Sequence, residues 1–199
     1  MYVQIGSAPL ADFNHPLQLM AECHRRVEHF LDVLLTLSRD RHGAPLNEAD
    51  RRALETALNY FISAAPRHHE DEELSLFPRL RASGNPAAVA AIDKVERLEA
   101  DHEAAKPDLL RVQEIGRQWI DRGTLTPDLA SEMQRRVGWL SGLYRQHIHT
   151  EDTEVFPLAL QVLDSAQVSE IGSEMALRRQ LNPGRAESRC GQRRRALQL

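Results

Sequence analysis

The chain has 199 residues, of which 42% are hydrophobic and 27% charged, as expected for one globular domain with a single core. It contains only two cysteines, which excludes a disulfide framework and a thiolate metal cluster. The formal net charge is −4, although seven arginines follow Leu177 in a stretch that we expect to be solvated. The preceding chain is therefore clearly acidic, which argues against nucleic acid as its main partner.

The N-terminal residues lack a basic segment followed by an apolar run, so we expect no secretory signal. No apolar stretch approaches the length of a membrane span, and the low cysteine content suits a reducing compartment. We therefore predict a cytoplasmic protein without a membrane partner. We also expect an irregular leader over 1–13, one domain over 14–181 and a basic, disordered tail over 182–199.

The first half of the domain shows two helical patterns. Apolar residues recur at helical spacing to about Arg41, and we expect Asn14 to cap this first helix. A second helix is predicted to open at Asn47 and to end before Ser83. Pro66 lies inside this second helix and should kink it, because proline removes a backbone hydrogen bond.

The second half repeats this arrangement. A third helix is predicted from about Pro86 to Asp121, interrupted at Pro107 and stopped by Gly123. A fourth helix should be capped by Thr126 and run to about Leu163 with a bend near Pro157. Ser165 is expected to cap a short fifth helix.

No stretch of the sequence shows the alternation of a strand. Short connections between long helices imply antiparallel neighbours. The predicted fold is therefore all-α, an up-and-down antiparallel four-helix bundle with a short extra C-terminal helix.

One pattern occurs twice, about eighty residues apart. His-x-x-x-Glu-[Glu/Asp]-x-x-x-Phe-Pro spans residues 68–78 and again residues 147–157. Positions i and i+4 share a helix face, so each copy presents one imidazole and one carboxylate to a common point. This ligand set suits iron, manganese or zinc, and two such pairs can surround two metal ions in a bundle. One copy alone would suggest a solvated acidic helix, but two copies in register favour a metal site.

A bundle site normally draws on all of its helices, so the first and third helices should contribute as well. The third helix offers only His102. The first offers His24 and His29, and these lie about 140° apart around a helix. His29 is therefore not expected to share the metal with His24. Glu73 and Asp152 follow the two motif carboxylates, and either hydrogen bonds to ligand imidazoles or simple solvation fits their position.

Taken together, these segments resemble the hemerythrin-like HHE cation-binding domain over about residues 14–160. The resemblance implies a helical bundle that holds two iron ions in a non-haem centre, with manganese or zinc as alternative metals. It further implies two bridging carboxylates, four terminal histidines and an oxo or hydroxo bridge between the metals. By this resemblance the ligands are His24, His68, Glu72, His102, His147 and Glu151.

The sequence departs from the oxygen-carrying hemerythrins at one point. Those proteins place two histidines four residues apart on the third helix, whereas Leu98 and Lys106 occupy the positions four residues from His102. The chain is similar instead to six-ligand members, which leave open metal positions for water, O₂, NO or peroxide. Reversible O₂ transport is accordingly not expected. His69 directly follows His68 and is an alternative seventh ligand.

Three functions remain open at this point. The first is a di-iron sensor, scavenger or stress-response component that binds a diatomic molecule or peroxide, with a redox or protein partner. The second is an enzyme that oxidises iron or turns over peroxide or NO at the same centre. The third is a metal-stabilised interaction module that works through its surface or its basic tail.

Overall fold

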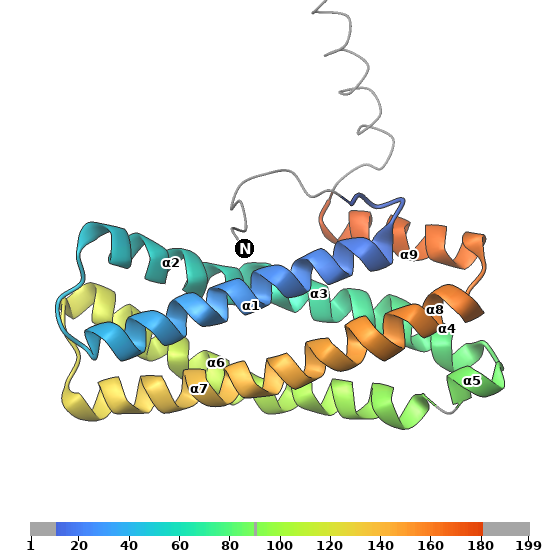
Figure 1. Ribbon diagram of the computed structural model, residues 1–199. Helices are drawn as coiled ribbons and strands as arrows, with labels where there is room; N and C mark the ends of the chain where they lie inside the picture. The colour runs from blue at the N-terminus through green and yellow to red at the C-terminus, as the bar shows by residue number, and fades with distance from the viewer. Residues whose placement is uncertain (1–10, 90, 181–199) are drawn as a thin grey trace, which may run out of the picture.

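A computed structural model of the protein describes residues 11–89 and 91–180, and every regular element within these ranges is helical. This confirms the all-α class for the described residues. The long helices lie along a common axis and their chain directions alternate (Figure 1). Most of the predicted leader and all of the predicted basic tail fall outside the described residues. The long helices are α1 (Pro16–Arg41), α2 (Glu48–Ser63), α6 (Ile92–Arg122) and α7 (Pro127–Thr150).

Shorter segments continue two of these helices, so the structure does not reproduce a simple count of four helices plus one. No described helix has the length and hydropathy needed to cross a bilayer. Two of the short segments are π-helical, η1 and η2. In chain order the segments are α3 (Ala65–Asp71), η1 (Glu72–Leu76), α4 (Phe77–Ala82), α5 (Pro86–Val89), η2 (Glu151–Val155), α8 (Phe156–Val162) and α9 (Ser165–Arg178).

Several predicted helix ends are confirmed. The side chain of Asn47 accepts a hydrogen bond from the backbone N–H of Asp50, and Thr126 caps α7 in the same way. Gly123 ends α6 with φ +78°, in the left-handed region that glycine enters without steric cost. The kink predicted at Pro66 corresponds to a break at Ala64, because α2 ends at Ser63 and a new helix begins at Ala65.

Two predicted caps are wrong by one residue. The residue before α1 is His15 rather than Asn14, and its side chain makes no capping bond. Pro16 needs no hydrogen-bond acceptor, because it has no N–H, and its fixed φ already suits the first turn. Asp164 rather than Ser165 caps α9, and it forms a reciprocal capping box with Gln167.

The predicted interruption at Pro107 is also wrong, because α6 continues through this proline. Pro107 removes the hydrogen bond to the carbonyl of Glu103, but both residues lie on the exposed side of the helix. Water can satisfy that carbonyl, and packing of the opposite face keeps the helix continuous.

The interior contains two apolar clusters, one at each end of the bundle. The larger one joins α1, α2, α6 and α7, and includes Leu34, Leu54, Ile115 and Met133. The smaller one joins the N-terminal turns of α1 and α6 to η1, α4, η2, α8 and α9 around Phe77 and Phe156. On α1 and α6 the members of the two clusters are about two turns apart, and His24 and His102 lie in these gaps. Glu151 lies in the corresponding gap between Ile148 of α7 and Val155 of η2. The polar centre therefore lies between the two apolar cores.

Candidate metal centre

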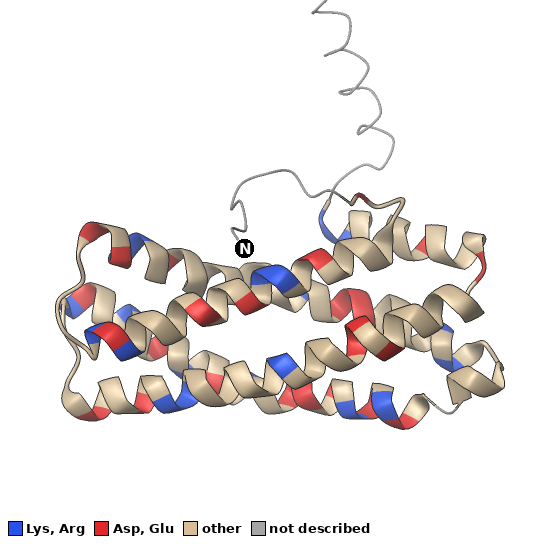
Figure 2. Cartoon of the chain, in the orientation of Figure 1, with Lys and Arg blue, Asp and Glu red and all other residues tan. Residues whose placement is uncertain are grey.

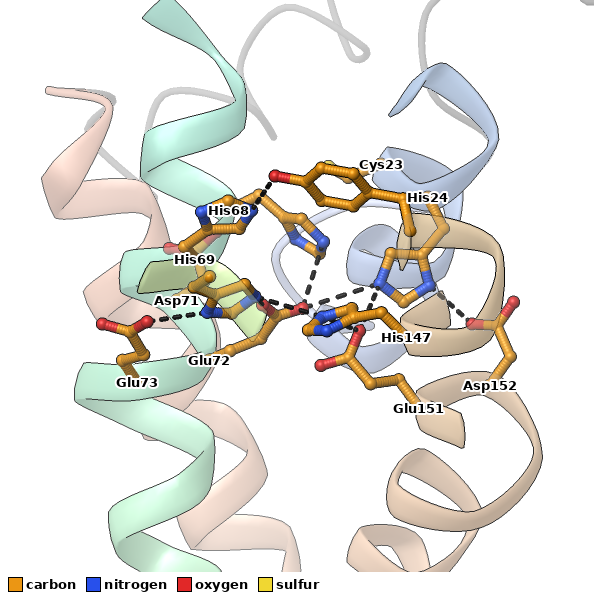
Figure 3. Close-up of polar contacts among 12 residues, drawn as sticks. Cys23, His24, His68, His69, Asp71, Glu72, Glu73, His147, Glu151 and Asp152 are labelled. Carbon is orange, nitrogen blue, oxygen red and sulfur yellow. Dashed lines mark hydrogen bonds and ion pairs between the residues drawn. The ribbon is translucent and has the colours of Figure 1, made fainter. Parts of the chain in front are cut away.

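The structure brings all six predicted site residues together in the interior of the bundle (Figure 3). They form two groups that share Glu72. Within each group the possible ligand atoms lie within 4.8 Å of one another, and every member is buried. One group is His24, His68, Glu72 and Glu151, and the other is Glu72, His102 and His147.

Each copy of the repeated motif supplies one histidine and one carboxylate from a single turn. His68 Nε2 lies 3.0 Å from Glu72 Oε1, and His147 Nε2 lies 3.2 Å from Glu151 Oε2. This is the i, i+4 relation predicted from the spacing. Figure 2 shows acidic segments where α3 continues toward α4 and where α7 continues toward α8, which are the two motif regions.

A π-helical turn begins at the carboxylate of each motif. The backbone N–H of Phe77 donates to the carbonyl of Glu72, and that of Phe156 donates to the carbonyl of Glu151. Pro78 and Pro157 follow, and in a regular α-helix each proline ring would clash with the carbonyl four residues earlier. The wider turn accommodates these prolines, which explains why Phe-Pro closes both motifs. Single π turns are rare and occur often at functional sites.

The phenylalanine of the second motif packs against the centre. The ring of Phe156 stacks on the imidazole of His24, with centroids 5.2 Å apart and planes 13° from parallel. Phe77, its counterpart in the first motif, is fully buried in the smaller cluster. The stacking contact restricts the orientation of the His24 ring.

The two motif carboxylates are fully buried, and none of their four oxygens has a hydrogen-bond partner. His24 Nε2 lies 3.0 Å from Glu151 Oε2 and 3.6 Å from Glu72 Oε1, but these contacts do not have hydrogen-bond geometry. Burial and the nearby charge of Glu151 raise the pKa of Glu72. Buried carboxylates without hydrogen-bond donors are costly unless a cation compensates their charge. These imidazole and carboxylate side chains therefore fit as ligands of bound metal ions.

Three of the four imidazoles are oriented by a further carboxylate. In each case Nδ1 donates to that carboxylate, which directs Nε2 toward the centre. Nε2 of His102 and Nε2 of His147 accordingly face each other at 3.1 Å, an arrangement that a shared cation stabilises. The pairs are His24–Asp152 at 2.7 Å, His102–Glu73 at 2.7 Å and His147–Asp101 at 3.4 Å.

This arrangement decides between the two interpretations of Glu73 and Asp152. Both hydrogen-bond to an imidazole of another helix, rather than being merely solvated. Asp101 has the same role, and the sequence analysis missed it. Its partner, His147, is on a different helix, so no local spacing indicates the contact. Its position directly before His102 was the only available signal.

His68 differs from the other three histidines. Its Nδ1 is buried and has no hydrogen-bond partner, and burial lowers its pKa well below the usual value. A neutral imidazole is the form that binds metal. His69 belongs to neither group: its ring stacks on His102 with centroids 3.8 Å apart, and its Nε2 lies 3.5 Å from the hydroxyl of Tyr144.

A pocket of about 430 Å³ reaches the centre between α2–α3 and α6. His69 and His102 form part of its lining, so it approaches the group that contains His147. Most of the remaining lining is apolar, including Phe61 and Leu109. Of the six predicted site residues, His102 is the one that lines this pocket.

Comparisons with known proteins agree with this chemistry. A family model described as the hemerythrin HHE cation binding domain matches residues 15–159. An uncharacterized protein of Haemophilus influenzae is 28% identical over 179 residues, which cover 86% of this chain and 94% of the relative. The matched range includes all six predicted site residues and both π turns, but it ends before α9.

Proposed function

The chain belongs to the hemerythrin HHE cation-binding domain family, and from this premise we propose that it is a non-haem di-iron protein that binds O₂, NO or peroxide. Its role would be that of a sensor, a scavenger or a stress-response component. The observation that carries the proposal is the pair of buried ligand groups with one shared carboxylate. Imidazole and carboxylate together suit iron, although manganese and zinc accept the same donors.

The six residues then take two roles. Glu72 belongs to both groups, as a bridging carboxylate would. Glu151 lies within 3.2 Å of nitrogens from both His24 and His147, which are in different groups, and this position supports a second bridge. The four histidines serve as terminal ligands through Nε2, three of them with Nδ1 held by a carboxylate.

Small-molecule binding is supported by the ligand count and by the pocket. Six protein side chains would leave open positions on two metal ions, and bound metal would supply Lewis-acid or redox chemistry for a small molecule there. The pocket beside His102 is mostly apolar, and the acidic Glu70 and Glu73 outnumber the one basic residue of its lining, Lys106. Such a lining favours uncharged ligands such as O₂ and NO over anions, because burying an anion there is costly.

The proposal is tested by metal analysis of anaerobically purified protein, with absorption spectra before and after addition of O₂ and NO. We expect about two iron ions per chain and a spectral change with each gas. Protein that retains only zinc and responds to neither gas would contradict the proposal and favour an interaction module. Turnover assays with peroxide and NO on the same sample distinguish reversible binding from catalysis.

Variants identify the ligands. Glu72→Ala and Glu151→Ala should both lose metal, because each removes a buried donor to the centre. Glu132→Gln is the control, since Glu132 pairs with Arg111 and Arg136 between α6 and α7 and belongs to neither ligand group. Full metal content in both ligand variants would overturn the assignment.

A further inference from the structure

A buried aspartate lies directly before the first π turn, η1. Asp71 directly precedes Glu72 and is 0% exposed. Arg178 Nη1 donates to its Oδ1 at 2.6 Å, and Arg179 Nη2 donates to its Oδ2 at 2.5 Å. Both arginines lie at the C-terminal end of α9, and the sequence analysis had assigned them to a solvated basic stretch. They instead neutralise a buried carboxylate next to the shared Glu72.

The same helix also contacts the far side of this turn. The hydroxyl of Ser75 donates to Glu174, and Arg178 donates to that hydroxyl. Arg79 donates to the backbone carbonyl of Ser75 at 2.9 Å and to Glu174 at 2.8 Å. We call this network, formed by Asp71, Ser75, Arg79, Glu174, Arg178 and Arg179, the α9 clamp.

The second motif has no counterpart of the clamp among the described residues. Aligning the motifs places Thr150 where the first has Asp71, and Glu154 where the first has Ser75. The Thr150 hydroxyl donates to a carbonyl of its own helix, that of Gln146, and the exposed Glu154 pairs with Lys94. The buried charges on the first motif are thus not a general requirement of the π turn.

Apolar packing fixes the position of α9 independently of the clamp. Ile171 and Met175 are fully buried in the smaller core cluster. A Cβ on Gly172 would lie 1.8 Å from the carbonyl oxygen of Phe13, so α9 passes very close to the segment before α1. The contacts of Arg178 and Arg179 with Asp71 are therefore not needed to hold α9 against the bundle.

We propose that Arg178 and Arg179 are positioning residues for the metal centre, acting through Asp71 to hold the turn that carries Glu72. This inference rests on the proposed metal site. Removing the arginines leaves the charge of Asp71 buried without a partner, which favours movement of that turn toward solvent. Such movement would displace the carboxylate shared by the two ligand groups.

The test measures the rate at which the metal-loaded, full-length protein releases metal to a chelator. R178Q/R179Q and Asp71→Asn should each release metal about tenfold faster than the unmodified protein, as for other residues that orient metal ligands. R178K/R179K keeps the charges and should recover part of this loss. Glu132→Gln is the matched control, because it breaks a carboxylate contact with two arginines that lies outside both ligand groups.

Thermal unfolding of the metal-free proteins separates positioning from general stability. Glu132→Gln and the clamp variants are both expected to unfold at lower temperature, but only the clamp variants should release metal faster. Release rates within twofold of the unmodified protein in both clamp variants would overturn the inference. If R178Q/R179Q does not fold, Asp71→Asn alone decides, since asparagine keeps the shape of the side chain without its charge.

The same experiment distinguishes this inference from the proposed function. If the unmodified protein takes up no metal, both the di-iron proposal and the positioning role are wrong. If it binds two ions that the clamp variants hold equally well, only the positioning role is wrong.

Discussion

The two motifs that form the centre, residues 68–78 and 147–157, are alike in what they present inward and different in what supports them from outside. Each supplies a histidine, a carboxylate and a π turn. Each also supplies a second acid that orients the histidine of another helix, Glu73 for His102 and Asp152 for His24. The difference is that α9 covers the first turn, whereas the second has surface contacts such as Lys94–Glu154. The motif therefore specifies the side chains that can bind metal, and the neighbouring helices determine how firmly each π turn is held.

The largest effect is expected from removing the carboxylate of either motif. Glu72→Ala and Glu151→Ala should both lose metal, but Glu151→Ala should retain more of it, because Glu72 belongs to both ligand groups whereas Glu151 belongs to one and only contacts His147 of the other. In the metal-free state the effect on stability has the opposite sign. The Glu72 carboxylate is then fully buried without a cation, so removing it should stabilise the protein by ~1–3 kcal/mol. Metal content and urea unfolding measure the two effects. Equal metal content in the two variants would remove this distinction between the motifs.

The acids that orient the histidines should rank next. Glu73→Gln and Asp152→Asn each weaken the hold on one Nδ1 proton, and we expect a loss of about 10–100-fold in metal affinity. Competition with a chelator measures this. Asp152 also receives a hydrogen bond from Arg25, so its replacement disturbs an additional contact. An unchanged affinity in both variants would show that the imidazoles are oriented by packing alone.

The motif histidines should differ in their response to pH in the metal-free protein. Burial alone would lower the pKa of His147, but the charge of Glu151 and the hydrogen bond with Asp101 raise the pKa to about 10. Burial lowers the pKa of His68 well below the usual value. At pH 7 the metal must therefore displace a proton from His147 but not from His68, so metal affinity should increase as pH rises.

The same pKa difference has a defined effect on stability. Because the pKa of His147 is higher in the folded than in the unfolded chain, its contribution is fully present below about pH 6.5. It is lost as pH rises toward about 10. NMR titration of the imidazoles and urea unfolding between pH 6 and 10 test this. A His147 resonance that titrates near pH 6 would contradict the assignment.

The smallest effects are expected at the outer contacts of the two turns. Glu154→Ala removes an exposed ion pair and should change the free energy of unfolding by about 0–0.5 kcal/mol. Ser75→Ala removes a buried hydroxyl that bonds to α9, and should destabilise by about 1 kcal/mol. Denaturant unfolding of the two variants in parallel measures the difference. A larger loss for Glu154→Ala would reverse the inferred asymmetry.

The sequence predicted the helical class and the inward residues because both depend on regular spacing. His68 and Glu72 share a face whatever surrounds them, and the repeat at His147 and Glu151 showed that this spacing was not accidental. Helix ends were less accurate, since Asn14 and Ser165 are good caps in isolation but the chain uses neighbouring residues. Pro107 was misjudged because an exposed proline can be tolerated when the opposite helix face is well packed.

The contacts missed by the sequence analysis all join segments that are distant in the chain. Asp101 reaches His147 on another helix, and Arg178 and Arg179 reach Asp71 over a separation of more than one hundred residues. Such contacts have no local period. The π turns were missed for a different reason: Pro157 suggested a bend, but a widened turn and a simple kink have the same sequence signal.

Burial of all six donor side chains affects how the protein acquires and exchanges its ions. An ion beside His24 and His68 is enclosed by helices and by the ring of Phe156. An ion beside His102 lies next to the pocket wall. We therefore expect biphasic exchange with isotopically labelled iron. The fast phase would come from the ion near the opening, and the slow phase would wait for transient separation of the helices around the enclosed one.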